Sequence, residues 1–144
     1  MSARKRLRVL LLITNLGKGG AQRVFHDHAL AFSAVHHVEE AVFDLSHDHR
    51  IYNTGLPLHD LQRNNWLSKL GPLGRLFSRA FALRRLVRER NFDVVVSHLD
   101  GANWVNVLSG TSAKKIAVIH GSVLYDRGQL RRRKWFRLHV IPRV

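Results

Sequence analysis

The sequence predicts an α/β fold in which a parallel sheet is covered by helices on both faces. Short runs of valine, leucine and isoleucine alternate along the chain with longer segments whose apolar residues recur at helical spacing. Strands that are buried on both faces have such continuous apolar runs, and residues 92–97 are the clearest example. The 144 residues, of which 45% are hydrophobic, suffice to bury one core. We therefore expect a single domain over residues 1–144.

The first half of the chain contains a strand, a glycine-rich loop, a helix and a second strand. The apolar run 7–13 predicts the first strand, and the polar loop 14–20 ends it. Residues 21–36 are expected to form a helix, and residues 38–45 the second strand. The helix face that carries the periodic pattern consists of Val24, His28, Ala31 and Val35.

A short third strand and a long helix follow. Residues 56–61 suggest the strand, and Pro57 restricts it to an edge or to a strand entry. A helix is expected over residues 71–90, with Pro72 in its first turn. The apolar stripe expected on this helix is Leu73, Leu76, Phe77, Ala80, Leu83 and Val87, with Arg84 on the same side.

The last part of the chain continues the alternation. The strand at 92–97 is followed by a short helix at 102–108 and a strand at 115–119. Residues 127–138 are typical of a very basic helix, and residues 139–144 resemble the start of a strand. Strands that alternate with helices favour right-handed crossovers, so the fold is expected to be a Rossmann-like parallel sheet.

The loop after the first strand has the composition of a phosphate-binding turn. Gly17, Gly19 and Gly20 allow positive φ angles and the close approach of a ligand. The N-terminus of the following helix directs free N–H groups and a partial positive charge at such a ligand. A tight turn from strand to helix needs only one glycine, so three glycines favour a binding loop.

Two common phosphate-binding motifs do not fit this loop. A P-loop requires a Lys-Ser or Lys-Thr pair that is missing here. A dinucleotide fingerprint requires glycine where Gln22 stands. Asp44, after the second strand, is placed where such enzymes bind a ribose, so a nicotinamide-dependent enzyme stays open as an alternative.

Three motifs together resemble glycosyltransferase family four. The segment Asn15-Leu16-Gly17-Lys18-Gly19-Gly20-Ala21-Gln22-Arg23-Val24 is similar to the Gly-Gly-Ala-Glu-Arg-Val segment of that family, with Gln22 in place of the commoner glutamate. The strand ends at 94–98 and 116–121 also resemble the family, in the same order. The resemblance covers the whole chain, but it corresponds only to the N-terminal, acceptor-side half of the family's two-domain GT-B fold.

The resemblance implies a retaining sugar transfer from a nucleotide-diphosphate sugar, without a metal ion or other cofactor. In that family the donor binds mainly to a C-terminal domain, which this chain lacks, so we expect a truncated domain that is inactive alone. Gly19 and Gly20 would approach the donor diphosphate, and His120 would act in catalysis beside the transferred sugar.

The acceptor, a glycan or a lipid-linked molecule of the cell envelope, is expected at the loops 97–101 and 120–126. His98, Asp100 and Gly121 are the candidate acceptor-binding residues. Asp100 has a second interpretation as the N-cap of the helix that follows it.

The charge of the chain restricts its partners to anionic ones. With 24 Lys and Arg against 10 Asp and Glu, the formal net charge is +14. Basic and aromatic residues gather in one segment that suits an anionic membrane surface, with Arg131, Arg132, Arg133, Lys134 and Trp135 as the candidates. An ordinary solvated helix is the alternative. Specific binding of nucleic acid would require stacking aromatics or a recognition module, and neither is visible.

Cysteine, histidine and hydropathy complete the expectations. The chain has no cysteine and no run of about 20 apolar residues, which fits a cytoplasmic protein that associates peripherally with the membrane. Its ten histidines show no spacing typical of a zinc site, so no metal is expected and most are interpreted as solvated or core-lining. An inactive fragment and a basic domain that binds nucleic acid or a dinucleotide remain the alternative functions.

Overall fold

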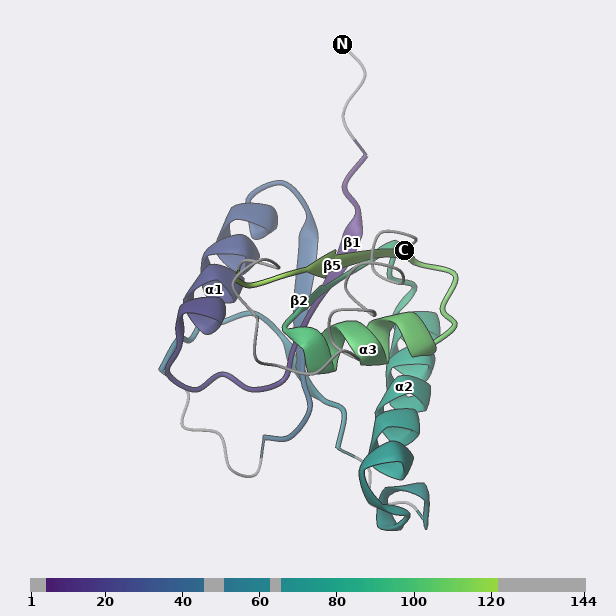
Figure 1. The fold of residues 1–144 in the computed structure, drawn as a ribbon. Coiled ribbons are helices and arrows are strands. Elements are labelled where there is room, and N and C mark those ends of the chain that lie inside the picture. The colour runs from purple at the N-terminus through teal and green to yellow at the C-terminus, as the bar shows by residue number, and fades with distance from the viewer. Residues whose placement is uncertain (1–4, 46–50, 63–65, 122–144) are drawn as a thin grey trace.

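The computed structural model describes residues 5–45, 51–62 and 66–121, which form a five-stranded parallel sheet with helices on both faces (Figure 1). In chain order the elements are β1 (Arg8–Ile13), α1 (Gly20–Ser33), β2 (His37–Val42), β3 (Leu58–Asp60), the 3-10 helix η1 (Trp66–Lys69), α2 (Gly71–Arg90), β4 (Val94–His98), α3 (Asp100–Leu108) and β5 (Lys114–Val118). The strand order is β3-β2-β1-β4-β5, and every neighbouring pair is parallel. The predicted α/β, Rossmann-like fold is confirmed.

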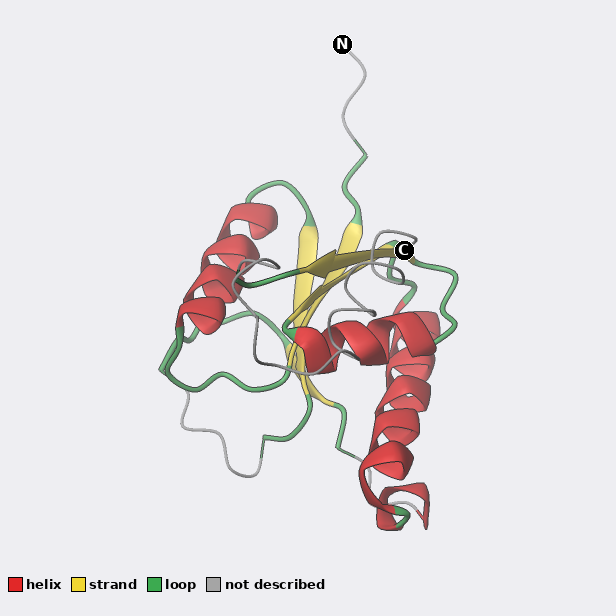
Figure 2. Cartoon of the chain, viewed as in Figure 1, coloured by secondary structure: helices red, strands yellow, loops and turns green. Residues whose placement is uncertain are grey.

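The sheet separates two hydrophobic cores. Because successive side chains of a strand point to opposite faces, Leu10 and Leu12 of β1 join the core beneath α2 and α3. Leu11 and Ile13 join the core beneath α1, where Phe25 is almost fully buried. Burying each of these large side chains contributes about 1.5–3 kcal/mol, so β1 is a main source of stability for both layers. Figure 2 shows the helices placed on the two sides of the strands.

The order of the strands reverses between β1 and β4. The chain moves from β1 outward to β2 and β3, and α2 then crosses back so that β4 pairs with the other side of β1. In sheets of this kind, loops diverge above the carboxyl ends at the reversal and leave a crevice in which ligands bind. A ligand is therefore expected at the carboxyl ends of β1 and β4, where the loops after these two strands begin.

The stripe expected on α2 is wrong in part. Leu73 is 70% exposed and Phe77 is 45% exposed, and Arg84 is exposed as well. Small residues are buried on the helix in addition to Ala80, Leu83 and Val87; they are Gly74, Ser78 and Ala82. At Gly74 the reason is the close approach of η1, since a Cβ there would lie 1.9 Å from the carbonyl oxygen of Leu67.

Within the described residues no helix is long and apolar enough to cross a membrane. The strand predicted near residues 56–61 is present as β3, at one edge of the sheet. The predicted elements at 127–138 and 139–144 lie outside the described residues. The same holds for the candidate membrane contacts Arg131, Arg132, Arg133, Lys134 and Trp135.

Candidate functional site

Three loops that the sequence singled out meet at the carboxyl edge of the sheet. The loop 14–19 follows β1, Leu99 follows β4, and residues 119–121 follow β5. The start of α3 packs closely on the first loop. A Cβ on Gly101 would lie only 3.2 Å from Cγ2 of Thr14, so a larger residue would push the two apart. Glycine at this position therefore brings the loops after β1 and β4 together.

The glycine loop is held by an amide that the sequence analysis treated as a departure from a motif. Gln22 is buried, and its Nε2 donates a hydrogen bond of 3.0 Å to Oδ1 of Asn15. The same oxygen accepts a bond of 3.2 Å from the N–H of Gly17. A glutamate at position 22 has no N–H to donate when it is ionised, so glutamine suits this contact.

The glycines of the loop do not have the backbone conformation that the sequence suggested. None of Gly17, Gly19 and Gly20 is in the left-handed region, and Gly19, the N-cap of α1, is extended at φ 173°. A Cβ on Gly19 would lie 2.3 Å from Oε1 of Gln22, whereas a Cβ on Gly20 would meet no atom within 4 Å in the described part of the chain. Gly19 therefore makes room for Gln22, and the surface beside Gly20 is open.

Histidines from α1, from β4 and from the loop after β5 form a cluster at this edge of the sheet. Nδ1 of His98, at the end of β4, lies 3.1 Å from Nε2 of His120, just after β5. The ring centroids of His98 and His28 are 5.2 Å apart, and Phe25 meets His98 edge-on at 5.3 Å. His98 has no exposed surface, and among the described residues its Nε2 has no hydrogen-bond partner.

Burial keeps the histidine pair neutral. It lowers the pKa of His98 to about 3, with further contributions from the charges that His120 and His28 would carry. The pKa of His120 is also lowered, first by burial and then by the neighbouring His28. At neutral pH the bond between His98 and His120 therefore joins two neutral rings, of which one donates and the other accepts.

A buried polar network fixes the end of β4 against β5. Ser97 donates a bond of 2.7 Å from Oγ to Oδ1 of Asn103, and Nδ2 of Asn103 donates to the carbonyl of Val118 at 3.2 Å. Asn106 donates from Nδ2 to Oγ of Ser97 at 3.0 Å. All three side chains are fully buried, which connects α3 to both strands just before His98 and His120.

The residues that follow β4 and β5 have unusual backbone conformations. Leu99 is at φ 74°, one of two non-glycine residues with positive φ in the described chain, and it is the N-cap of α3. Asp100 is the first residue of α3 and lies within its first turn, so its interpretation as the N-cap is wrong. Gly121 is at φ 96°, and a Cβ there would meet no described residue within 4 Å.

The histidine cluster does not have the arrangement of a metal site. Across residues 5–45, 51–62 and 66–121 the structure contains no group of three or more His, Asp or Glu side chains that could hold a metal ion.

The sequence analysis missed three parts of this site. It interpreted His28 as an ordinary residue of a helix face, and it did not consider Asn103 or Asn106. The only signal was the presence of two asparagines three residues apart on a helix expected to pack on the sheet.

No protein-family model matches the sequence, and no curated protein matches it. Among solved structures, the chain is similar to the lipopolysaccharide outer core galactosyltransferase WaaB in its apo form. The TM-score is 0.61 at 18% sequence identity, over 84% of this chain and 35% of that one. The chain thus spans about a third of the length of that enzyme. Its Rossmann-like fold is shared with part of a glycosyltransferase.

Proposed function

We propose that this chain is the acceptor-side domain of a GT-B glycosyltransferase, which transfers a sugar from a nucleotide-diphosphate sugar with retention of configuration. The observation that carries the proposal is that the uncapped N-terminus of α1 and the His98–His120 pair both lie at the carboxyl edge of one parallel sheet. The shared fold with part of a galactosyltransferase supports the class of enzyme.

The N-terminus of α1 would interact with the donor diphosphate. Gly19 offers no side-chain cap, and the first turn of α1 has no acidic residue, so its N–H groups and partial positive charge are not offset by a carboxylate. The open space beside Gly20 allows a phosphate oxygen to approach the backbone. N–H groups placed this way stabilise the charge that develops on a leaving diphosphate.

His120 would hydrogen-bond the transferred sugar. Its partner His98 is fully buried and cannot reach a solvent-borne acceptor, so we assign His98 to positioning. The bond at 3.1 Å fixes the ring of His120 and its tautomer, since one of the two facing nitrogens carries the hydrogen. Asp100 and Gly121 border the same edge and would contact the acceptor, a glycan or a lipid-linked molecule.

A titration of the whole chain with uridine diphosphate tests the donor site. We expect amide chemical shifts in NMR spectra to change at Gly19, Gly20 and Ala21, because the ligand would bind at their N–H groups. Shift changes confined to exposed arginine and lysine residues would contradict the proposal. Changes near Asp44 upon addition of NADH, with none from uridine diphosphate, would instead favour a dinucleotide enzyme.

Two glycine variants separate binding from folding. Gly20→Ala places a methyl group in open space, so we expect the free energy of unfolding to change by less than about 0.5 kcal/mol while the affinity for uridine diphosphate falls severalfold. Gly19→Ala would displace Gln22 from Asn15, so we expect a loss of about 1 kcal/mol of stability. Denaturant unfolding measures the stabilities. Equal affinity in Gly20→Ala and in the unmodified chain would contradict the diphosphate site.

A further inference from the structure

A cavity lies at the amino edge of the sheet, the opposite edge from the histidine cluster. Its volume is about 440 Å³. The last turns of α2 line one side, and the residues that precede β4 and β5 line the rest. The charged and polar side chains of the lining are those of Arg84, Arg88, Asn91, Asp93, Thr111 and Ser112. The proposed sugar transfer uses none of them.

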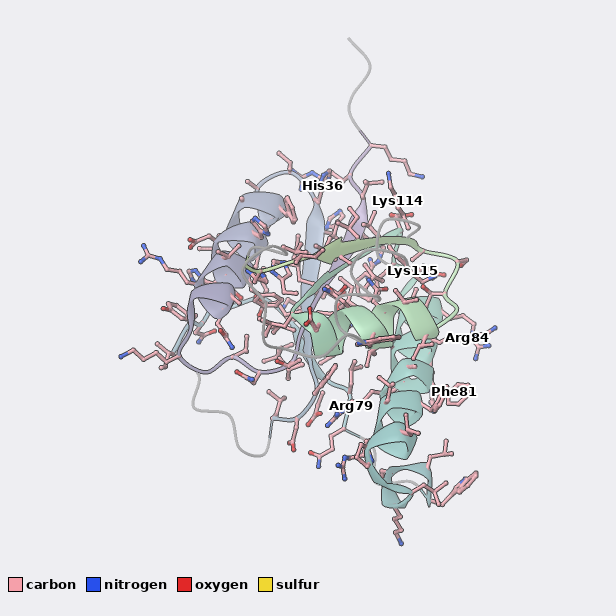
Figure 3. All side chains as sticks on the ribbon, in the orientation of Figure 1. His36, Arg79, Phe81, Arg84, Lys114 and Lys115 are labelled. Atoms are coloured by element: carbon pink, nitrogen blue, oxygen red, sulfur yellow. The ribbon has the colours of Figure 1, made fainter. Side chains whose placement is uncertain are left out.

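Two arginines of α2 make one side of this amino-edge cavity cationic. Arg84 and Arg88 are four residues apart, so they are neighbours on one face of the helix. Figure 3 shows Arg84 extending beside the end of α3, and a Cβ on Gly110 would lie 3.8 Å from Nη1 of Arg84. Among the described residues neither arginine has an ion pair. Both charges can therefore pair with a ligand.

The loop between α3 and β5 adds hydroxyl groups to the cavity. Thr111 and Ser112 both line it. Oγ1 of Thr111 is buried and has no hydrogen-bond partner in the described part of the chain. A buried hydroxyl that makes no hydrogen bond lowers stability, and a ligand that bonds to it recovers the loss. Guanidinium groups together with hydroxyl donors suit the oxygens of a phosphate.

A carboxylate borders the same cavity and indicates what else the ligand carries. Oδ2 of Asp93 accepts a bond of 2.8 Å from the backbone N–H of Arg8, which holds the carboxylate in place. Carboxylates repel phosphate but accept hydrogen bonds from hydroxyl groups. Nucleobases commonly stack on an aromatic face, whereas Phe92 in the lining is only 5% exposed. The arrangement favours a phosphate attached to a hydroxyl-bearing chain or ring.

We propose that the amino-edge cavity binds a small phosphorylated polyol, of the class of sugar phosphates, at a site separate from that of sugar transfer. Arg84 and Arg88 bind the phosphate, and Asp93 accepts bonds from the hydroxyl groups of the polyol. The cavity volume is within the range of roughly 300–1,000 Å³ that is usual for small-molecule sites. The C-terminus of α2 carries a partial negative charge that disfavours an anion, so binding requires both arginines.

An NMR titration of the whole chain tests the proposal with glucose 6-phosphate, inorganic phosphate and glucose as probes. We expect glucose 6-phosphate to shift the amide signals of Asn91 and of residues 110–112. Inorganic phosphate should shift the same signals with lower affinity, and glucose should leave them unchanged. Arg84→Gln with Arg88→Gln should lower the affinity for glucose 6-phosphate at least about tenfold, because two charged donors are lost.

Two further variants separate the ligand contacts from the fold. Thr111→Val replaces the hydroxyl by a methyl group. Because Oγ1 of Thr111 has no partner among the described residues, the unfolding midpoint should stay the same or rise, while the affinity for glucose 6-phosphate falls between about twofold and tenfold. Asp93→Asn keeps an acceptor for the N–H of Arg8 but removes the charge, so the ratio of the affinities for glucose 6-phosphate and inorganic phosphate should fall.

A matched control distinguishes the cavity from the general basicity of the chain. Arg75→Gln with Arg85→Gln makes the same change in net charge at exposed positions of α2 that do not line the cavity. We expect this pair to keep most of the affinity for glucose 6-phosphate. Thermal unfolding of each variant, with a midpoint no lower than that of the control pair, establishes that the fold is intact.

Equal losses of affinity in the two arginine pairs would overturn the proposal, as would shifts confined to basic residues outside the cavity. If vesicles of phosphatidylglycerol shift the signals of residues 110–112 and glucose 6-phosphate does not, the proposal is wrong as well. The arginine pair of the cavity should leave the shifts that uridine diphosphate causes at Gly19 and Gly20 unchanged. A failure at the cavity is therefore distinguishable from a failure of the donor site.

Discussion

β1 and β4 are neighbouring strands at the centre of the sheet, but their carboxyl ends differ. Both strands are buried, and β1 stays apolar through Ile13. β4 changes from valine to Ser97 and His98, which are fully buried polar residues. Burial of a polar group costs free energy unless it is hydrogen-bonded. Every residue at the end of β1 therefore contributes to stability by apolar burial, whereas the last two residues of β4 do not.

The difference shows where polar side chains are buried at a cost in stability and hold neighbouring side chains in place. The polar side chains at the end of β4 contact the carbonyl of Ile116 in β5 and the ring of His120. The same number of apolar side chains would pack there at lower cost, but they would leave His120 without a partner. Functional sites are the places where local rules of stability are commonly broken.

The largest effect is expected from weakening β1. Leu12→Ala removes a fully buried side chain and should lower the free energy of unfolding by about 3 kcal/mol, because the cavity beneath α2 and α3 stays unfilled. Denaturant unfolding measures the loss. The NMR titration of His120 in the folded fraction should stay as in the unmodified chain, and a shifted titration would contradict the separation between the two strands.

An effect of similar size is expected from acid. The pKa of His98 is about 3 in the folded chain and near 6.5 when unfolded, so the unfolded chain binds more protons below pH 6.5. Above pH 6.5 His98 is neutral in both states and does not change the free energy of unfolding. Below that pH the free energy of unfolding falls by at most about 1.4 kcal/mol per pH unit until about pH 3. Unfolding midpoints measured at pH 7, 5 and 4 follow the loss. His98→Asn should flatten this dependence, and an equal slope in both chains would contradict it.

The smallest effect is expected from the network beneath the histidines. Asn103→Ala leaves Ser97 and the carbonyl of Val118 without a side-chain partner, which should cost about 1–2 kcal/mol. Because β5 is then less firmly held, the pKa of His120 should move back toward its ordinary value. NMR titration measures that pKa. Loss of stability without any change in the titration would show that the network does not position His120.

The sequence predicted the sheet because the burial of a strand is visible in its own residues. The apolar runs at β1 and β4 correspond to strands that are buried on both faces. The edge position of β3 followed from Pro57. The predictions for α2 were partly wrong, since periodicity shows which side chains are apolar and not which of them obtain a partner. Burial of Gly74 depends on η1, whose approach no local pattern reports.

The site was predictable only in outline for the same reason. The strand-end positions of His98 and His120 placed them at one edge, as parallel strands require. Their partner His28 comes from a helix 70 positions earlier in the chain, and its contact with His98 depends on how α1 packs. Polar residues such as Asn103 resemble surface residues in a sequence. Their burial requires hydrogen-bond partners, and these are recognisable only once the chain is folded.

The orientation of His98 toward His120 depends on one apolar side chain, that of Leu99. It carries the whole change of direction between β4 and α3 in a conformation that costs a residue with a Cβ about 1–3 kcal/mol. That conformation persists because the leucine is packed against the core beneath α1. Loosening this core would let the corner relax and would rotate the imidazole of His98 away from His120. The bond between His98 and His120 would then be lost through a substitution that touches neither ring.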